Sequence, residues 1–245
     1  MAIRAVSLDL FDTLVDLRFD PGAAARSSAH SLHAAVAAHR DLAFEAFAEA
    51  LRAGDREWRE TRYAEGLEVA TEERFACLLE RLGIDHPDLA EKLTRIHMGV
   101  IRSCVVVPEH HDGLLRELRE HVRIGLCSNF SHAPTAHSIL EEAGLRGRLD
   151  AVAISVDVGV RKPRREIFEA VVSGLRAAPE DTLHVGDNLH ADVAGAASFG
   201  MRTAWITRRV PDPDAALAGF DGPRPDFVVA DLRELLPLVR RPAHR

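Results

Sequence analysis

Six short apolar runs, separated for the most part by helical patterns, constrain the fold of this chain more than any other feature. The runs cover about residues 3–9, 122–127, 150–155, 182–186, 202–206 and 226–230. Between them, helical spacing of apolar residues is found at about 109–121, 132–143, 164–177 and 189–199. Strands that alternate with helices form βαβ units, whose strands pair in parallel. The sequence therefore predicts an α/β fold with a doubly wound, Rossmann-like parallel sheet.

The first and second runs are separated by a long interval, far longer than a single crossover connection needs. The interval is rich in Ala, Glu, Arg and Leu, begins near Pro21-Gly22 and ends near Pro108. Its helical periodicity covers 26–53, 72–83 and 87–102. We therefore expect a core domain made of residues 1–16 and 107–245, with residues 17–106 inserted as a mostly helical cap.

Residues with chemically useful side chains follow these runs. Asp9 ends the first run, Ser128 follows the second, and Asp187 follows the fourth, with Asp192 five residues later. Lys162 follows the third run after a short loop. The carboxyl ends of parallel strands meet at one edge of the sheet, and ligands bind in the crevice outside that edge. We expect a carboxylate nucleophile, a hydroxyl, an ammonium and two more carboxylates to gather there.

The order of these segments resembles the haloacid dehalogenase superfamily, whose members are mostly magnesium-dependent phosphatases. The resemblance covers the whole chain and rests on four motifs and the helical insertion after the first: Asp9 to Thr13, Ser128-Asn129, Arg161-Lys162-Pro163, and Gly186-Asp187 with Asp192. It implies that Asp9 attacks phosphorus and carries the phosphoryl group, while Ser128 and Lys162 hold the phosphoryl oxygens. It also implies that Asp187 binds Mg²⁺ and that Asp192 supports the metal site from outside the ligand shell.

General chemistry agrees with these roles. A carboxylate nucleophile divides hydrolysis into two easier steps, and phosphoryl transfer otherwise depends on positioning and charge stabilisation. Because two anions repel each other, a cation is needed between Asp9 and a phosphate, and Mg²⁺ prefers the oxygen ligands that Asp9 and Asp187 provide. Thr13 is a further candidate for contact with substrate. Asn129 either fixes the loop around Ser128 or contacts the substrate.

One position departs from the family pattern. Phosphatases of this family usually have a second Asp two residues after the nucleophile, which acts as general acid and base, and here that residue is Phe11. The family's metal ligand at this position is the backbone carbonyl, which Phe11 can still supply. A positioned acid is typically worth ~10² to 10⁴ in rate. Asp12 and His132 are alternative proton donors, although Asp12 also suits a turn and His132 a helix start.

Three functions remain open at this point. An aromatic residue at position 11 also resembles the family's dehalogenases, which displace halide from carbon without a metal. A chain that lacks the acid can instead bind a phosphorylated ligand as a regulatory protein with negligible turnover. The carboxylates Asp187 and Asp192 favour the phosphatase, because buried carboxylates without a cation are costly. We therefore expect a Mg²⁺-dependent hydrolase of a small phosphorylated metabolite.

Composition excludes several other classes of partner. The net charge of −7 argues against a nucleic-acid-binding surface, and no apolar run approaches the ~18 residues that a membrane-spanning helix needs. Cys77, Cys104 and Cys127 lack the spacing of a metal site. We expect them to be reduced thiols in a cytoplasmic protein.

Charged residues in the expected cap have two interpretations. One is contact with an anionic substrate, by Arg59, Arg62, Tyr63 and Arg74. Equally, charges that alternate in sign between residues 55 and 74 are typical of a solvated helix face. The sequence alone leaves both open.

Overall fold

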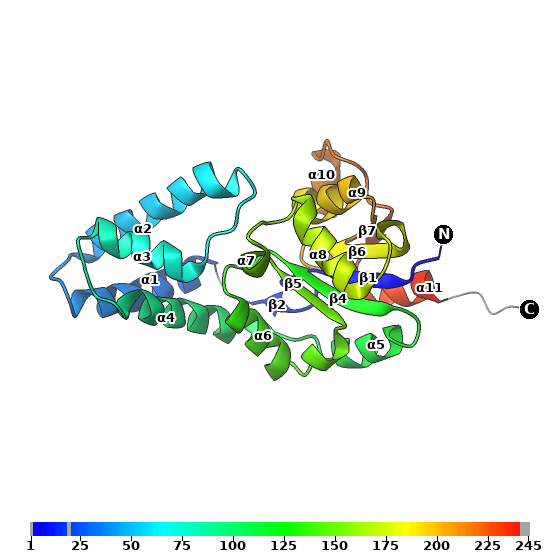
Figure 1. Cartoon of the computed structure of the whole chain (residues 1–245), viewed down its shortest axis with the longest axis horizontal. Helices are drawn as coiled ribbons and strands as arrows, with labels where there is room; N and C mark the ends of the chain where they lie inside the picture. The colour runs from blue at the N-terminus through cyan, green and yellow to red at the C-terminus, as the bar shows by residue number, and fades with distance from the viewer. Residues whose placement is uncertain (1, 19–20, 241–245) are drawn as a thin grey trace, which may run out of the picture.

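A parallel sheet of six strands, in the order β5-β4-β1-β6-β7-β8, lies at the centre of the fold (Figure 1). The computed structural model describes residues 2–18 and 21–240. The strands are β1 (Ala5–Leu8), β4 (Arg123–Ser128), β5 (Ala151–Ile154), β6 (Thr182–Gly186), β7 (Arg202–Ile206) and β8 (Phe227–Val229). All neighbouring strands are parallel. Each strand lies within two residues of a predicted one, so the predicted fold class is confirmed.

The chain winds in both directions from β1. It first passes to β4 and β5 on one side of β1, and then returns to β6, β7 and β8 on the other side. This reversal makes the carboxyl end of β1 a topological switch point, which is where open α/β sheets bind their ligands.

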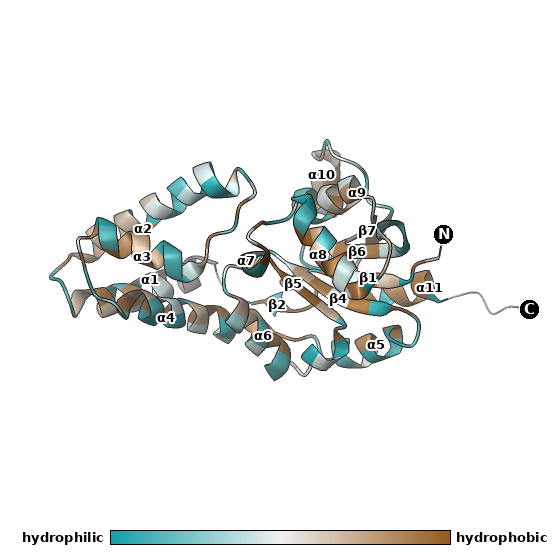
Figure 2. Ribbon diagram, viewed as in Figure 1, coloured by the Kyte–Doolittle hydropathy of each residue, from teal (hydrophilic) through white to brown (hydrophobic). Residues whose placement is uncertain are grey.

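Helices cover both faces of the sheet (Figure 2). The helices of this part of the chain are α5 (His111–Leu118), α6 (Ala133–Glu142), α7 (Ser155–Val158), α8 (Arg165–Leu175), α9 (Gly195–Phe199), α10 (Pro213–Ala218) and α11 (Leu236–Val239). Shorter turns are η2 (Arg146–Arg148), η3 (Pro179–Asp181), η4 (Leu189–Ala194, a π-helix) and η5 (Leu232–Leu235). One apolar cluster joins the sheet to α5 and α6, and a second joins it to α8 and α9. Burial on both faces explains why the strands are nearly continuous apolar runs.

Residues 21–103 form a segment of helices, called the helical segment below, which lies to one side of the sheet (Figure 1). It contains α1 (Pro21–Ala37), α2 (Phe44–Trp58), the π-helix η1 (Arg59–Tyr63), α3 (Thr71–Arg81) and α4 (Leu89–Ser103). It has an apolar core of its own, which includes Phe47, Phe75 and Leu93. The periodic stretch 26–53 is two helices rather than one. Leu42, between them, packs against the same core and so preserves the apolar spacing across the break.

The two connections of the helical segment pair with each other. β2 (Asp16–Leu17) and β3 (Val105–Val106) form an antiparallel ladder, which brings the start and the end of the insertion together. The sequence did not indicate these strands, because two residues are too few to show an alternating pattern. The boundaries of the expected cap, 17–106, stay a prediction. Residues 19 and 20 of the expected cap and 241–245 of the expected core lie outside the described residues.

Two expectations drawn from composition can be compared with the structure. In residues 2–18 and 21–240, no helix has the length and apolar character needed to span a bilayer. Cys77, Cys104 and Cys127 are all free thiols. Burial raises the pKa of the Cys127 thiol to about 12, against the smaller effect of Lys162, so Cys127 is an unreactive strand residue.

Gly195 allows α9 to approach the loop that carries Lys162. A Cβ atom at Gly195 would lie 2.9 Å from the Cα of Pro163 and 2.9 Å from a ring carbon of Phe168. We expect Gly195→Ala to lower the free energy of unfolding by ~1–3 kcal/mol through overpacking. Gly113, in α5, is the matched control, since among the described residues no atom beyond its chain neighbours and its own helix backbone lies within 4 Å of a Cβ built there. Gly113→Ala should be neutral or raise stability by up to ~1 kcal/mol. Denaturant unfolding measures both, and equal effects would contradict the packing argument.

Candidate active site

The register of the sheet brings the predicted site residues to one edge. Leu8 pairs with Leu126 of β4 and with Val185 of β6. Asp9 therefore leaves β1 at the level where β4 and β6 end, and its N–H donates to the carbonyl of Val185 (2.9 Å). Ser128 is the buried last residue of β4. The convergence of strand ends follows directly from parallel pairing.

Lys162 is the buried cation of this edge. Its Nζ donates to Asp9 Oδ1 at 2.5 Å and to the carbonyl of Cys127 at 2.7 Å. It also lies 2.7 Å from Asp192 Oδ1. Burial disfavours the ammonium, but the negative charges of Asp192 and Asp9 outweigh this effect and raise the pKa of Lys162. The lysine is therefore charged, and it joins a residue of β4 to residues that follow β1 and β6.

Asn129 holds the backbone of Lys162 in place. The N–H of Lys162 donates to Asn129 Oδ1 (2.7 Å), and Asn129 Nδ2 donates to the carbonyl of Lys162 (3.0 Å). Both ends of the side-chain amide are therefore used within the protein. This arrangement favours the loop-fixing role of Asn129 over direct contact with a substrate.

Asp192, close to Asp9, is held by several donors. Asp192 Oδ2 accepts from the N–H of Asn188 (3.0 Å), and Oδ1 lies 3.0 Å from His184 Nε2 as well as close to Lys162. Burial opposes its ionisation, but Lys162 and His184 more than offset that effect and hold the pKa of Asp192 below its usual value. A Cβ at Gly186 would lie 2.2 Å from Asp192 Cγ, so only glycine lets the side chain lie against the end of β6.

Asp187 has the opposite electrostatic environment. Burial, followed by the negative charges of Asp9 and Asp192, raises the pKa of Asp187 to about 7. One carboxylate oxygen from each of the three aspartates lies within 4.8 Å of the others, while Lys162 contacts only Asp9 and Asp192. The three carboxylates thus outnumber the one ammonium among them. Hard oxygen ligands in this arrangement fit Mg²⁺, whose charge would relieve the repulsion.

The three residues after Leu10 have different environments. The Phe11 ring packs edge-on against Phe130, with ring centroids 5.1 Å apart. Asp12 has a φ of 55° and accepts a hydrogen bond from the N–H of Leu17 (3.3 Å), so it is a turn residue. Thr13 is buried, and its Oγ1 has no hydrogen-bond partner in residues 2–18 and 21–240.

His132, the other alternative proton donor, starts a helix. It is the N-cap of α6, where its Nδ1 accepts from the N–H of Thr135 (3.3 Å) and lies 2.8 Å from Thr135 Oγ1. Burial lowers the pKa of His132, which favours the neutral ring that this cap requires. Its ring is thus engaged in starting α6.

Two residues of the site were missed by sequence reasoning. His184 lies between Asp192 and Ser7, whose Oγ is 3.1 Å from His184 Nδ1. Trp205 donates from Nε1 to the carbonyl of Asp187 (2.8 Å). An ionisable residue inside the apolar run 182–186 was an available signal for His184. Trp205 resembled any other core residue of its strand.

Comparison with known proteins agrees with this geometry. The family model of haloacid dehalogenase-like hydrolases matches residues 3–200. The chain is a haloacid dehalogenase-like hydrolase. Phosphoserine phosphatase from Thermus thermophilus is similar to this hydrolase, with 31% identity over 211 residues, which cover 82% of this chain and 81% of that protein. The resemblance inferred from the four motifs is therefore confirmed.

Solved structures share the fold of this hydrolase. The 2-haloacid dehalogenase from Pseudomonas syringae pv. tomato DC3000 matches with a TM-score of 0.73 and 21% identity, covering 96% of this chain and 97% of that one. The HAD-hydrolase YfnB from Bacillus subtilis, solved with bound magnesium, matches with a TM-score of 0.63 and 21% identity, covering 98% and 100%. These likenesses show a common fold, which hosts both dehalogenases and magnesium-binding hydrolases.

The contrast between Asp192 and Asp187 predicts opposite effects on stability. Asp192→Asn leaves the buried Lys162 with one charged partner fewer and should lower the free energy of unfolding by ~3–5 kcal/mol. Asp187→Asn removes a charge repelled by its neighbours, so in EDTA it should leave stability unchanged or raise it by ~1 kcal/mol. Thermal and denaturant unfolding of both variants in EDTA measure this. A loss of similar size in both would show that the two carboxylates are not in different environments.

Proposed function

We propose that this hydrolase is a Mg²⁺-dependent phosphatase that acts on a small phosphorylated metabolite through a phosphorylated Asp9. The observation that carries the proposal is the cluster of Asp9, Asp187 and Asp192, in which one oxygen of each residue lies within 4.8 Å of the others, while the Lys162 ammonium contacts Asp9 and Asp192. The similarity to a phosphoserine phosphatase supports it further.

In the proposed reaction, a carboxylate oxygen of Asp9 forms a bond to phosphorus while the bond from phosphorus to the leaving oxygen breaks. Water then adds to phosphorus, the bond to Asp9 breaks, and phosphate leaves with Asp9 restored. Lys162 orients Asp9 through its 2.5 Å contact and, with Ser128, holds the phosphoryl oxygens. Asn129 fixes the loop that positions Lys162.

The metal would be held by the side chains of Asp9 and Asp187 and by the carbonyl of Phe11, with Asp192 outside its ligand shell. Bound Mg²⁺ supplies positive charge that offsets the repulsion between a carboxylate nucleophile and a phosphate. In this role Asp192 keeps Lys162 and the loop after β6 in place.

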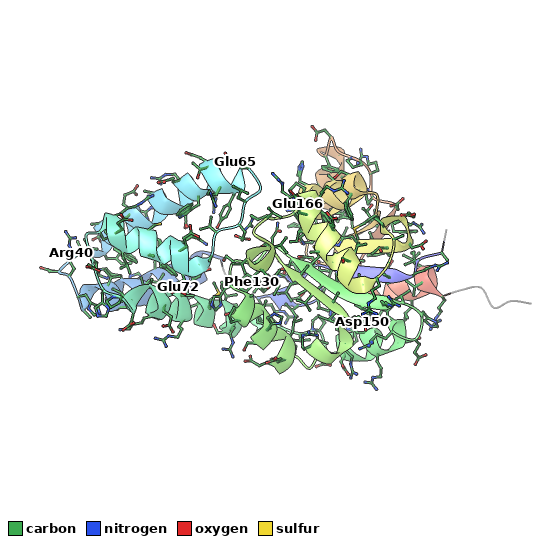
Figure 3. The ribbon with its side chains drawn as sticks, viewed as in Figure 1. Arg40, Glu65, Glu72, Phe130, Asp150 and Glu166 are labelled. Atoms are coloured by element: carbon green, nitrogen blue, oxygen red, sulfur yellow. The ribbon has the colours of Figure 1, made fainter. Side chains whose placement is uncertain are left out.

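We also propose that residues 17–106 act as a cap over the site. The loop that follows η1 in the helical segment binds the core at three places: the N–H of Glu68 donates to the carbonyl of Gly159 (3.0 Å), that of Arg161 to Gly66 (2.9 Å), and that of Thr71 to Ser131 (3.0 Å). Phe130 is labelled in Figure 3, where it lies between the helical segment and the sheet. These contacts support a cap whose loop lies beside the ends of β4 and β5.

The second candidate function is that of a metal-independent dehalogenase. The apolar pair of Phe11 and Phe130 favours it, because displacement of halide from carbon requires no proton donor at this position. Asp9 would then displace the halide and form an ester, which water hydrolyses. A third possibility, a phospho-ligand-binding regulator, requires binding without turnover.

Removal of the nucleophile and of the metal separates these functions. Asp9→Asn should abolish turnover, because the amide is nearly isosteric but a poor nucleophile. It should also lower stability, because Lys162 loses one charged partner, and melting curves check that the variant is folded. For the unaltered protein, we expect phosphate release from a panel of phosphate esters with Mg²⁺, and its loss in EDTA. The measurements are phosphate and halide release, each with Mg²⁺ and with EDTA.

Each alternative has its own result in this assay. Halide release that EDTA does not affect would establish the dehalogenase in place of the phosphatase. Binding of phosphate esters without release of either ion would indicate the regulator. Substantial turnover by pure Asp9→Asn would refute the role of Asp9.

The presence of Phe11 predicts that the rate of cleavage depends strongly on the leaving group of the phosphate ester. Without a general acid, aryl and acyl phosphates should be cleaved much faster than alkyl phosphates, since their leaving oxygens need little protonation. Phe11→Asp should raise turnover of alkyl phosphates selectively, by up to ~10²-fold if the new carboxyl is protonated. Turnover is measured over a series of esters of graded leaving-group pKa.

Melting curves for both proteins control for loss of folding, because Phe11→Asp also removes the packing against Phe130. A flat dependence on leaving-group pKa in the unaltered protein would show that another group already supplies the proton.

A further inference from the structure

A cleft of about 420 Å³ lies between the helical segment and the loops of the core. On the side of the helical segment it is lined by Arg59, Tyr63 and Arg74, from η1 and α3. On the core side, Phe130 and Arg161 line it. Three of the four residues that were open to an anion-binding interpretation in the sequence therefore lie on one cleft, and Arg62 does not line it.

Residues that line the cleft are direct sequence neighbours of the predicted phosphate-binding residues. Asn129, which also lines it, directly follows Ser128, and Arg161 directly precedes Lys162. Neighbouring Cα atoms are ~3.8 Å apart. A small molecule with its phosphate at Ser128 and Lys162 can thus extend its other end toward the cleft.

Arg161 is fixed in the wall of the cleft. Its Nη1 donates to both carboxylate oxygens of Glu68 (2.8 and 2.7 Å), and its guanidinium lies over the ring of Tyr63, 4.4 Å from the centroid. Glu68 is buried and also accepts hydrogen bonds from the N–H of Val69 and from Ser155 Oγ. Because one nitrogen of the guanidinium is bound by Glu68 and its plane lies over Tyr63, Arg161 forms a rigid part of the wall.

The other two guanidinium groups have hydrogen-bond donors to spare. Arg74 Nη2 contacts Asp55 Oδ1 (2.5 Å), but its Nε is buried and has no acceptor among the residues that the structure describes. Arg59 is exposed and forms no ion pair with any described residue. Arg161 is neutralised by Glu68 and Arg74 by Asp55, so the unpaired charge of Arg59 gives the cleft an excess of one positive charge.

We infer that this cleft binds a second anionic group of the substrate, a carboxylate or a further phosphate, at the end remote from the phosphate that is cleaved. The inference rests on the proposed function and narrows its substrate class to phosphomonoesters that carry a second acid group. The planar fork of a guanidinium fits both carboxylate and phosphate oxygens, and the volume suits a small metabolite rather than a polymer.

A matched pair of ligands tests the inference without turnover. 3-Phosphoglycerate and glycerol 3-phosphate differ by a carboxylate in place of a hydroxymethyl group. In the Asp9→Asn protein with Mg²⁺, calorimetric titration should show ~10-fold tighter binding of 3-phosphoglycerate, the usual scale for one charge-assisted contact. Fructose 1,6-bisphosphate against fructose 6-phosphate tests a second phosphate in the same way.

Two arginines of η1 provide the variant and its control, each made in the Asp9→Asn protein. The affinity ratio is the affinity of the ligand with two acid groups divided by that of its partner with one, taken for the pair that shows the larger difference. Arg59→Gln removes a charge that lines the cleft and should reduce this ratio to ~2. Arg62→Gln removes an exposed charge three residues away that does not line the cleft, and the ratio should stay at its original value. An affinity ratio near one for both pairs would overturn the inference, as would equal effects of the two variants.

Turnover of the unaltered protein separates this inference from the proposed function. Mg²⁺-dependent phosphate release with no preference for esters that carry a second acid group, together with affinity ratios near one, would overturn the inference alone. A different result is tight binding of the ligands with two acid groups, dependent on Arg59, without phosphate release from any ester. This result would overturn the phosphatase proposal and leave the cleft as an anion-binding site.

Discussion

The buried ammonium of Lys162 is the interaction on which the site depends. Its partners are Asp9 after β1, the carbonyl of Cys127 in β4 and Asp192 after β6. A buried charge is stable only when its partners and hydrogen bonds are all in place, since losing one partner of a buried pair is strongly destabilising. The three strands must therefore be in register before the ammonium is satisfied. Asn129 completes the arrangement, because it fixes the backbone of Lys162 to the loop after β4. The stability of the core and the geometry of the candidate site are thus maintained by the same contacts.

The same ammonium explains the distribution of charge around it. It contacts Asp9 and Asp192, and burial together with the negative charges of these two residues raises the pKa of Asp187. This local excess of negative charge supports the proposed metal. The sign of the excess charge is opposite in the cleft, which is lined by Arg59, Arg74 and Arg161. An elongated ligand with acid groups at both ends would match these two regions.

Much of the fold and part of the site could be predicted from sequence, for a physical reason. Strands buried on both faces are continuous apolar runs, and a polar residue such as Asp9 or Asp187 at the end of a run is conspicuous. Contacts between distant residues have no such local signal. Arg161 and Glu68 are 93 positions apart, and the β2–β3 ladder joins two-residue strands. The two hydrogen bonds between the Asn129 amide and the backbone of Lys162 could not be predicted either, because they depend on how two loops meet in space.

Phe11 affects the charge of the site as well as its chemistry, because it is apolar where the family's phosphatases usually have an Asp. A carboxylate at position 11 would add negative charge near three carboxylates that already repel one another. Such repulsion, together with burial, would raise the pKa of a carboxyl group at position 11 and so favour the protonated form that an acid catalyst requires. With Phe11, the position is apolar and its ring packs against Phe130, the residue that also lines the cleft. The Phe11 ring therefore connects, through Phe130, to the wall of the cleft. This apolar contact takes the place of a proton donor at position 11.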